Sequence, residues 1–241
     1  MGIDYETAKW LQANVQLRGK RVLTCGRQNW WLSKRESAKL GWKSAPVWSR
    51  TNYADDFFAR EGALCHSVDL VADEHPTFRE DLGRFAAIEE SCMRQRYDII
   101  MDFGTAEHVA DQTAYWENLW DALMPDQSLC VGILPANSLC GHGLYQYSPE
   151  FFHNFTGFKP RGIWLVTYGP RVTWKPWKPQ GRFQSRTWWP TYVAFILEKC
   201  GNQLQMPVQF QNATTPTSRE KPWAKHLVEL PGIRFLERLL K

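Results

Sequence analysis

Short hydrophobic runs that alternate with helix-like segments constrain the fold of this chain more than any other feature. Strand-like runs occupy 20–26, 45–50, 64–73, 97–103 and 128–134. Spacing or end signals typical of helices or turns mark the segments 29–42, 52–63, 78–96 and 113–125 between them, and also 5–17 and 148–155. This alternation favours a mostly parallel sheet with helices on both faces.

The two remaining strand-like runs, 162–169 and 191–199, are separated by a loop-like segment instead of a helix. Strands joined in this way predict an antiparallel edge. The predicted fold class is therefore α/β: a Rossmann-like, doubly wound, mostly parallel seven-stranded sheet with an antiparallel edge. We expect this domain over 1–200, with a Trp/Arg-rich insert at 169–190, and a C-terminal extension over 201–241.

Composition excludes several classes of protein. Hydrophobic residues make up 44% and charged residues 22%, as in soluble globular proteins. No apolar run is long enough to span a bilayer and no secretory signal opens the chain, so we expect no membrane partner. The six cysteines form no CxxC pair and predict free thiols in the cytoplasm. The histidines at 66, 75, 153 and 226 show no metal-ligand pattern, so no metal is predicted.

The stretch YDIIMDFGTAEHV at 97–109 ends a strand-like run in a polar corner. Ligands of parallel sheets bind beyond the carboxyl ends of strands, and the corners after Leu23, Val68, Met101 and Leu134 would share that rim. Strand-ending Asp69 and Asp102 either contact a ligand or cap the following turn. Both interpretations remain open from the sequence.

Other polar side chains of this rim also have two interpretations. His108, which follows Glu107 at a predicted helix start, is either a general base or a partner for a neighbouring loop. The segment GHGLYQY at 141–147 either forms a substrate wall or packs around a turn. The wall would consist of His142, Tyr145, Gln146 and Tyr147.

Positive charge and tryptophan are concentrated near the C-terminal third. Residues 151–197 hold seven Lys or Arg and no Asp or Glu, so with a net charge of +4 the rest of the chain carries −3. The stretch WKPWKPQGRFQSRTWW interleaves indoles with cations. Aromatic rings stack on sugars or bases, and cations meet phosphate, which predicts a lid with Trp174 and Arg182 as substrate contacts. Packing of the loop on the sheet is the alternative.

Over 97–152 the sequence resembles class I S-adenosylmethionine-dependent methyltransferases. Four stretches carry the resemblance: YDIIMDFGTAEHVADQ, the helix-like ENLWDALMPDQSL, CVGILPANS and GHGLYQYSPEFF. The resemblance implies S-adenosyl-L-methionine as cofactor. The implied cofactor contacts are Gly26, Asp69, Asp102, Phe103, Gly104 and Thr105. The first turn, TCGRQNWW, keeps only Gly26 of the family's glycine-rich motif, and Asp55 and Asp56 are candidates for the acidic residue that grips the ribose.

The leading functional prediction is methyl transfer to an oxygen or nitrogen of an anionic or glycan-type acceptor, with Glu107 and His108 as catalytic residues. It requires a pocket opposite Gly26 that Arg27 and Trp30 leave open. The alternative is a degenerate methyltransferase-fold protein that binds nucleic acid or protein through its basic, Trp-rich face. A third hypothesis is an assembly subunit that docks through the apolar tail at 225–241. The oligomeric state is not predicted.

Overall fold

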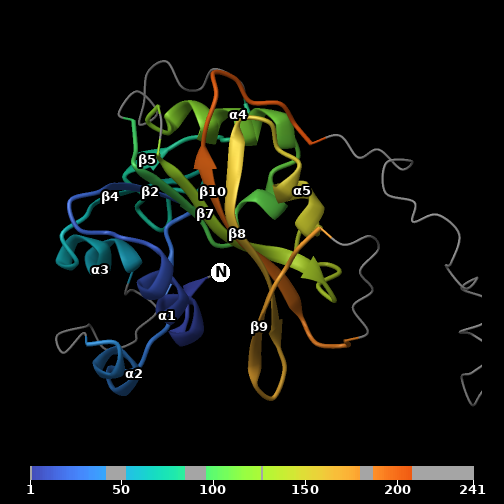
Figure 1. The fold of residues 1–241 in the computed structure, drawn as a ribbon. Helices are drawn as coiled ribbons and strands as arrows, with labels where there is room; N and C mark the ends of the chain where they lie inside the picture. The colour runs from blue at the N-terminus through green and yellow to red at the C-terminus, as the bar shows by residue number, and fades with distance from the viewer. Residues whose placement is uncertain (1, 42–52, 85–95, 126, 180–186, 208–241) are drawn as a thin grey trace, which may run out of the picture. The chain divides into compact units, whose positions relative to one another are not determined.

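The computed structural model describes residues 2–41, 53–84, 96–125, 127–179 and 187–207. An eight-stranded sheet runs through them in the order β5-β4-β2-β6-β7-β10-β8-β9 (Figure 1). Its strands are β2 (Arg21–Cys25), β4 (Leu64–Asp69), β5 (Phe78–Arg79), β6 (Ile99–Asp102), β7 (Leu129–Asn137), β8 (Phe158–Tyr168), β9 (Val172–Pro176) and β10 (Thr191–Lys199). A separate parallel pair joins β1 (Gly2–Ile3) to β3 (Asn29–Trp30).

The pairing of these strands confirms the predicted fold class. The five strands from β5 to β7 are parallel to their neighbours, whereas β10 and β8 continue the sheet antiparallel. An additional strand, β9, pairs antiparallel with β8. It arises from the first part of the Trp/Arg-rich insert, so the described sheet has one antiparallel strand more than predicted.

Helices cover both faces of the sheet (Figure 1). They are α1 (Tyr5–Asn14), α2 (Lys34–Lys39), α3 (Ala54–Arg60), the 3-10 turn η2 (Ala106–His108), α4 (Gln112–Ala122) and α5 (Pro149–His153). Side-chain caps fix where three of them begin: Asp4 accepts from Thr7 N, and Asp111 accepts from Ala114 N. A capping box between Ser33 and Glu36 starts α2.

Strand alternation divides the core into two layers. Ile99 and Met101 of β6 pack with residues of α1 and α3, whereas Ile100 packs with residues of α4 and α5. Successive side chains of a strand point to opposite faces of the sheet. Asp102, the last residue of β6, and Phe103, which follows it, therefore point to opposite faces.

The structure departs from the predicted elements in particular places. The helix predicted over 78–96 begins instead with β5, and residues 85–95 lie outside the described part of the chain. The strand predicted at 45–50, Arg182 and the tail at 225–241 also lie outside it. No helix among the described residues has the length and apolar character needed to cross a membrane.

Candidate active site

Three parallel strands end side by side at one rim of the sheet. Cys25 of β2 pairs with Val68 of β4 on one side and with Asp102 of β6 on the other. A hollow of about 630 Å³ opens beyond these ends, within the usual range for small-molecule pockets. Its lining is Val68, Asp69, Leu70, Val71, Glu80, Asp81, Leu82, Gly83, Arg84, Gly104, Thr105, His108, Val109, Ala110 and Asp111.

Four acidic residues line this pocket, among them Asp69 and Asp81, whose carboxylates accept backbone N–H groups. Asp69 accepts the backbone N–H of Val71 through Oδ1, at 2.9 Å. Asp81 accepts the backbone N–H of Gly83 at 3.0 Å, and its other oxygen lies 3.1 Å from Nε of Arg84. The backbone contacts fix both carboxylates at the lining, where they can accept hydrogen bonds from hydroxyl or amino groups. Aliphatic side chains of the lining, among them Leu70, Val71, Leu82 and Val109, offer a surface for a flat apolar ring.

Gly26 does not line the pocket itself but lies beside two residues that do, Asp69 and Thr105. Its φ of 72° is in the left-handed region that favours glycine. A Cβ at this position would lie 2.9 Å from Oγ1 of Thr105 and 3.6 Å from Oδ2 of Asp69. The Thr105 hydroxyl also donates to the carbonyl of Cys25 at 2.8 Å. A single glycine therefore lets the corners after β2, β4 and β6 approach one another.

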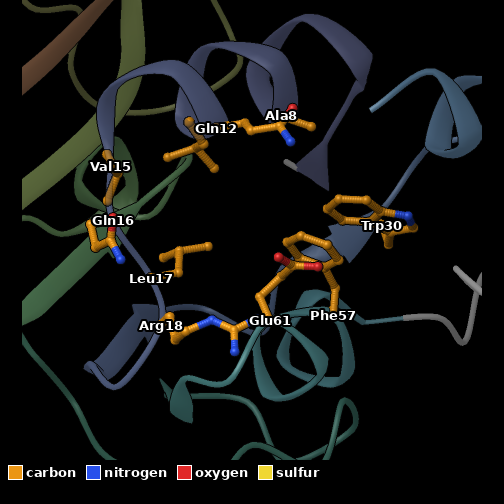
Figure 2. A pocket seen from close by; sticks show the side chains of 10 residues that line it. Ala8, Gln12, Val15, Gln16, Leu17, Arg18, Trp30, Phe57 and Glu61 are labelled. Atoms are coloured by element: carbon orange, nitrogen blue, oxygen red, sulfur yellow. The ribbon is translucent and has the colours of Figure 1, made fainter. Parts of the chain in front are cut away.

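Neither Arg27 nor Trp30 lines the pocket. Arg27 turns to Asp55, with Nη2 3.0 Å from its Oδ2, and its guanidinium lies over the ring of Tyr53. Trp30 stacks on Phe57 with ring centroids 4.4 Å apart. Figure 2 shows these two rings beside a different cavity of about 210 Å³, which α1 and α3 help to line. The two side chains that could have filled the predicted pocket therefore lie outside this one, and Gly26 and Phe103 are not among its lining residues.

Asp102 holds the turn after β6. Its side chain is fully buried and accepts the backbone N–H groups of Gly104, Thr105 and Ala106 at 2.8–3.2 Å. The hydroxyl of Tyr115 in α4 donates to it at 2.7 Å. Burial raises the pKa of this carboxyl, and these hydrogen bonds oppose the shift. These contacts match the turn-capping interpretation, and Asp102 is absent from the pocket lining.

Glu107, in the same corner, has a different environment. It is also fully buried, but neither carboxylate oxygen accepts a hydrogen bond from the described residues. Burial, and secondarily the nearby Asp102, raise the pKa of Glu107 to about 8. Its Oε1 lies 3.4 Å from Nε2 of His142 and 3.9 Å from Nε2 of His108. The structure therefore brings both predicted catalytic residues next to a predicted substrate residue.

The two histidines are half-exposed above this carboxylate. Side-chain exposure is 50% for His108 and 40% for His142, and their ring centroids lie 5.4 Å apart. Burial and the neighbouring His142 lower the pKa of His108. The neutral form of His108 is thus favoured near neutral pH, and a neutral imidazole can accept a proton or bind a metal.

The remaining predicted wall residues fall into the loop after β7. The Tyr145 hydroxyl donates to the carbonyl of Ala110 at 2.7 Å, which ties this loop to the pocket rim. Gln146 accepts the backbone N–H of Leu139 within its own loop. Tyr147 is buried and donates to Gln112 at 2.8 Å. Of the four, His142 and Tyr145 thus lie beside the site, whereas Gln146 and Tyr147 make contacts that shape the loop.

Other predicted contacts lie elsewhere. Phe103 points to the opposite face from Asp102 and lines a hollow of about 350 Å³ with Trp31, Tyr168 and Tyr192. Trp174 of β9 stacks on Trp10 of α1, with ring centroids 5.4 Å apart. It therefore packs against the core layer on the α1 and α3 side of the sheet. This is a packing contact, as in the alternative interpretation of the insert.

Asp81, Leu82 and Val109 were missed as pocket residues. Asp81 and Leu82 follow β5, a two-residue strand inside a segment with helical spacing, so no periodicity marked them as a corner. Asp55, a predicted ribose ligand, is paired with Arg27 and does not line the pocket, whereas Asp69 is one of the acidic residues that do. In the sequence, the position of Asp69 at the end of a predicted strand indicated that it would lie at this rim.

No protein-family model matches the chain, and no curated protein sequence matches it significantly. Similar solved structures include a proposed methyltransferase from Bacillus halodurans C-125, with 10% identity, coverage of 82% of this chain and 99% of that one, and a TM-score of 0.47. A proposed S-adenosylmethionine-dependent methyltransferase from Listeria monocytogenes has 12% identity, coverage of 82% and 99%, and a TM-score of 0.41. An S-adenosylmethionine-dependent methyltransferase from Mesorhizobium loti has 13% identity, coverage of 72% and 64%, and a TM-score of 0.36.

Proposed function

We propose that this chain transfers a methyl group from S-adenosylmethionine to an oxygen or nitrogen of an anionic or glycan-type acceptor. The observation that carries the proposal is the pocket at the carboxyl ends of β2, β4 and β6, where carboxylates stand beside aliphatic side chains. Its volume of about 630 Å³ suits a nucleoside with an amino-acid side arm.

The residues present fit an adenosyl group. Asp69 would accept hydrogen bonds from the ribose hydroxyls, and Asp81 from an exocyclic amine. Leu70, Leu82 and Val109 would pack on the faces of the base. The glycine at position 26 avoids a Cβ that would lie 2.9 Å from Oγ1 of Thr105, a lining residue.

When bound, S-adenosylmethionine supplies a methyl group on a positively charged sulfur. The protein's part is mainly to hold the acceptor in line, since positioning alone is worth up to about 7–11 kcal/mol. His108 lies in the pocket lining, and its lowered pKa keeps it neutral and able to accept an acceptor proton. The support for the anionic acceptor class is the charge of the segment 151–197, which has seven basic side chains and no acidic one; none of its described residues lines the pocket.

Calorimetric titration with S-adenosylhomocysteine tests this function. We expect micromolar binding, about −8 kcal/mol, by the wild-type chain. Asp69→Asn should weaken it at least about tenfold, because one good hydrogen bond to a charged group contributes about 1.5–3 kcal/mol. Asp73→Asn is the matched control, since Asp73 is exposed on the following turn and is not part of the lining.

Two results would contradict the proposal. The first is the absence of binding by wild type at millimolar nucleoside. The second is equal affinity in wild type and Asp69→Asn, which would place the nucleoside elsewhere. The first result would leave the alternative of a catalytically degenerate binding protein, whose affinity for an oligonucleotide should fall steeply with salt.

A further inference from the structure

Three side chains with metal-binding atoms gather where η2 meets the loop after β7. Glu107 and His108 are neighbours in η2, and His142 comes from 34 residues further along the chain. One ligand atom from each lies within 4.8 Å of the other two. Oε1 of Glu107 is 3.4 Å from Nε2 of His142 and 3.9 Å from Nε2 of His108.

The backbone fixes this meeting point. The N–H groups of Leu144 and Tyr145 both donate to the carbonyl of Glu107, at 2.7 and 3.2 Å. Gly143 packs so closely that a Cβ there would lie 2.8 Å from Cγ of Glu107. The loop that carries His142 is therefore held against η2 by contacts that do not involve the imidazole.

The carboxylate of Glu107 is the observation that points to a ligand. It is fully buried, both oxygens lack a hydrogen-bond donor among the described residues, and one oxygen faces the two imidazoles. A buried carboxylate without donors is costly to keep, because it loses its hydration and gains nothing in return. A cation between it and the histidines would supply the missing partner.

We propose that Glu107, His108 and His142 bind one divalent transition-metal ion. Two imidazoles and one carboxylate are a common ligand set for zinc, iron(II) and related ions, and three protein ligands leave coordination positions open. Metal–ligand bonds of about 2.0–2.2 Å place neighbouring ligand atoms roughly 3–3.5 Å apart. The separations from Oε1 of Glu107, 3.4 and 3.9 Å, are close to this range, and all three ligand atoms already lie within 4.8 Å of one another.

The open positions face solvent at the pocket rim, because both imidazoles are half-exposed and His108 lines the pocket. They suit an oxygen ligand such as an acceptor hydroxyl, whose pKa a bound divalent ion would lower. With the ion bound, this effect would replace proton transfer to Nε2 of His108, whose lone pair would then bind the metal. This role for the metal deepens the proposed methyl transfer and depends on it. Binding of the ion itself does not depend on the methyl transfer.

Calorimetry on the tag-free full-length chain, freed of metal with EDTA and dialysed, tests the site. Zinc chloride should bind wild type at one ion per chain with a Kd in the micromolar range or tighter, and magnesium chloride at least tenfold more weakly. Glu107→Gln and His142→Asn should each weaken zinc binding at least about 50-fold. His153→Asn, an exposed histidine of α5 outside the cluster, should leave it unchanged.

The variants also separate loss of ligand from loss of fold. His142 is half-exposed, so His142→Asn should melt within a few degrees of wild type in the metal-free state. Zinc binding that is absent in wild type, or that persists undiminished in both Glu107→Gln and His142→Asn, would overturn the site.

A titration of S-adenosylhomocysteine into the same metal-free preparations distinguishes the two proposals. Nucleoside binding without zinc binding would overturn the metal site alone. Zinc binding that requires Glu107 and His142, without nucleoside binding, would support the metal site and overturn the proposed methyltransferase function.

Discussion

Asp102 and Glu107 are two fully buried carboxylates in one corner, with opposite surroundings. Asp102 accepts hydrogen bonds from three backbone N–H groups and from Tyr115. Glu107 accepts none from the described residues and faces two histidines at the pocket rim. The start of the corner thus stabilises the fold, whereas its end carries a buried group that weakens the fold and is available to a ligand.

The largest expected effect is the loss of the Asp102 side chain. Asp102→Ala leaves three N–H groups and one hydroxyl without their acceptor in a buried site, so we expect the free energy of unfolding to fall by about 3–5 kcal/mol. Urea denaturation measures it. The control is Asp111→Ala, which removes the single cap bond of α4 and should cost about 1 kcal/mol. If Asp102→Ala lowered the free energy of unfolding no more than Asp111→Ala does, Asp102 would not be the stabilising carboxylate of the corner.

Glu107→Gln should raise the free energy of unfolding of the metal-free protein, whereas Asp102→Ala lowers it. Burial raises the folded-state pKa of Glu107 to about 8 from an ordinary 4.5. Between these values the folded protein holds a proton that the unfolded chain has released, so the free energy of unfolding of wild type falls as the pH rises. A neutral amide avoids that loss. We expect the variant to be more stable than wild type by about 1–3 kcal/mol at pH 7, with the difference vanishing near pH 4.5.

Urea denaturation of both proteins at pH 4.5, 6, 7 and 8 gives this difference directly. A variant less stable than wild type at pH 7 would show that Glu107 has a stabilising partner. The two carboxylates would then be alike, and the contrast between the two ends of the corner would fail.

Gly143→Ala tests how firmly the loop after β7 holds the end of the corner. The added methyl would meet Cγ of Glu107 at 2.8 Å and its backbone oxygen at 2.9 Å, so the loop must shift. We expect a loss of about 1–3 kcal/mol on thermal or urea unfolding. Gly169→Ala, where the nearest atoms are at 3.4 Å, is the control and should stay within about 0.5 kcal/mol of wild type. Equal values would mean the loop is free to move.

Tyr115→Phe should have the smallest effect on stability among the changes at the start of the corner. It removes one hydrogen bond to Asp102 and leaves the three backbone bonds in place, so we expect a loss of about 1–2 kcal/mol in urea denaturation. Tyr145→Phe removes a hydroxyl that donates to Ala110 from an exposed ring, and should cost less than about 1 kcal/mol. If Tyr115→Phe were the cheaper change, the start of the corner would not depend on its buried network.

Six strands of the sheet, β2, β4, β6, β7, β8 and β10, were predictable because they carry strong local signals. The apolar run at Ile99–Asp102, followed by Gly104, marked both a strand and its polar corner. The capping interpretation of Asp102 also needed only local information, since its three backbone donors come within four residues.

The rest of the site depends on contacts that no local pattern encodes. The approach of His142 to Glu107 requires two loops from different strands to meet, and spacing along the chain says nothing about it. β5 is two residues long, too short for alternation to show, so Asp81 stayed hidden in a helix-like segment. Trp174 was misleading because an indole suited to stacking on a sugar is equally suited to packing on Trp10.

A structure determined with S-adenosylhomocysteine would show whether the nucleoside occupies the pocket beyond the ends of β2, β4 and β6. We predict the ribose hydroxyls within hydrogen-bond distance of Asp69 and the adenine among Leu70, Leu82 and Val109. A nucleoside bound instead in the hollow beside Phe103 or in the cavity beside Trp30, or no nucleoside at millimolar concentration, would contradict the account.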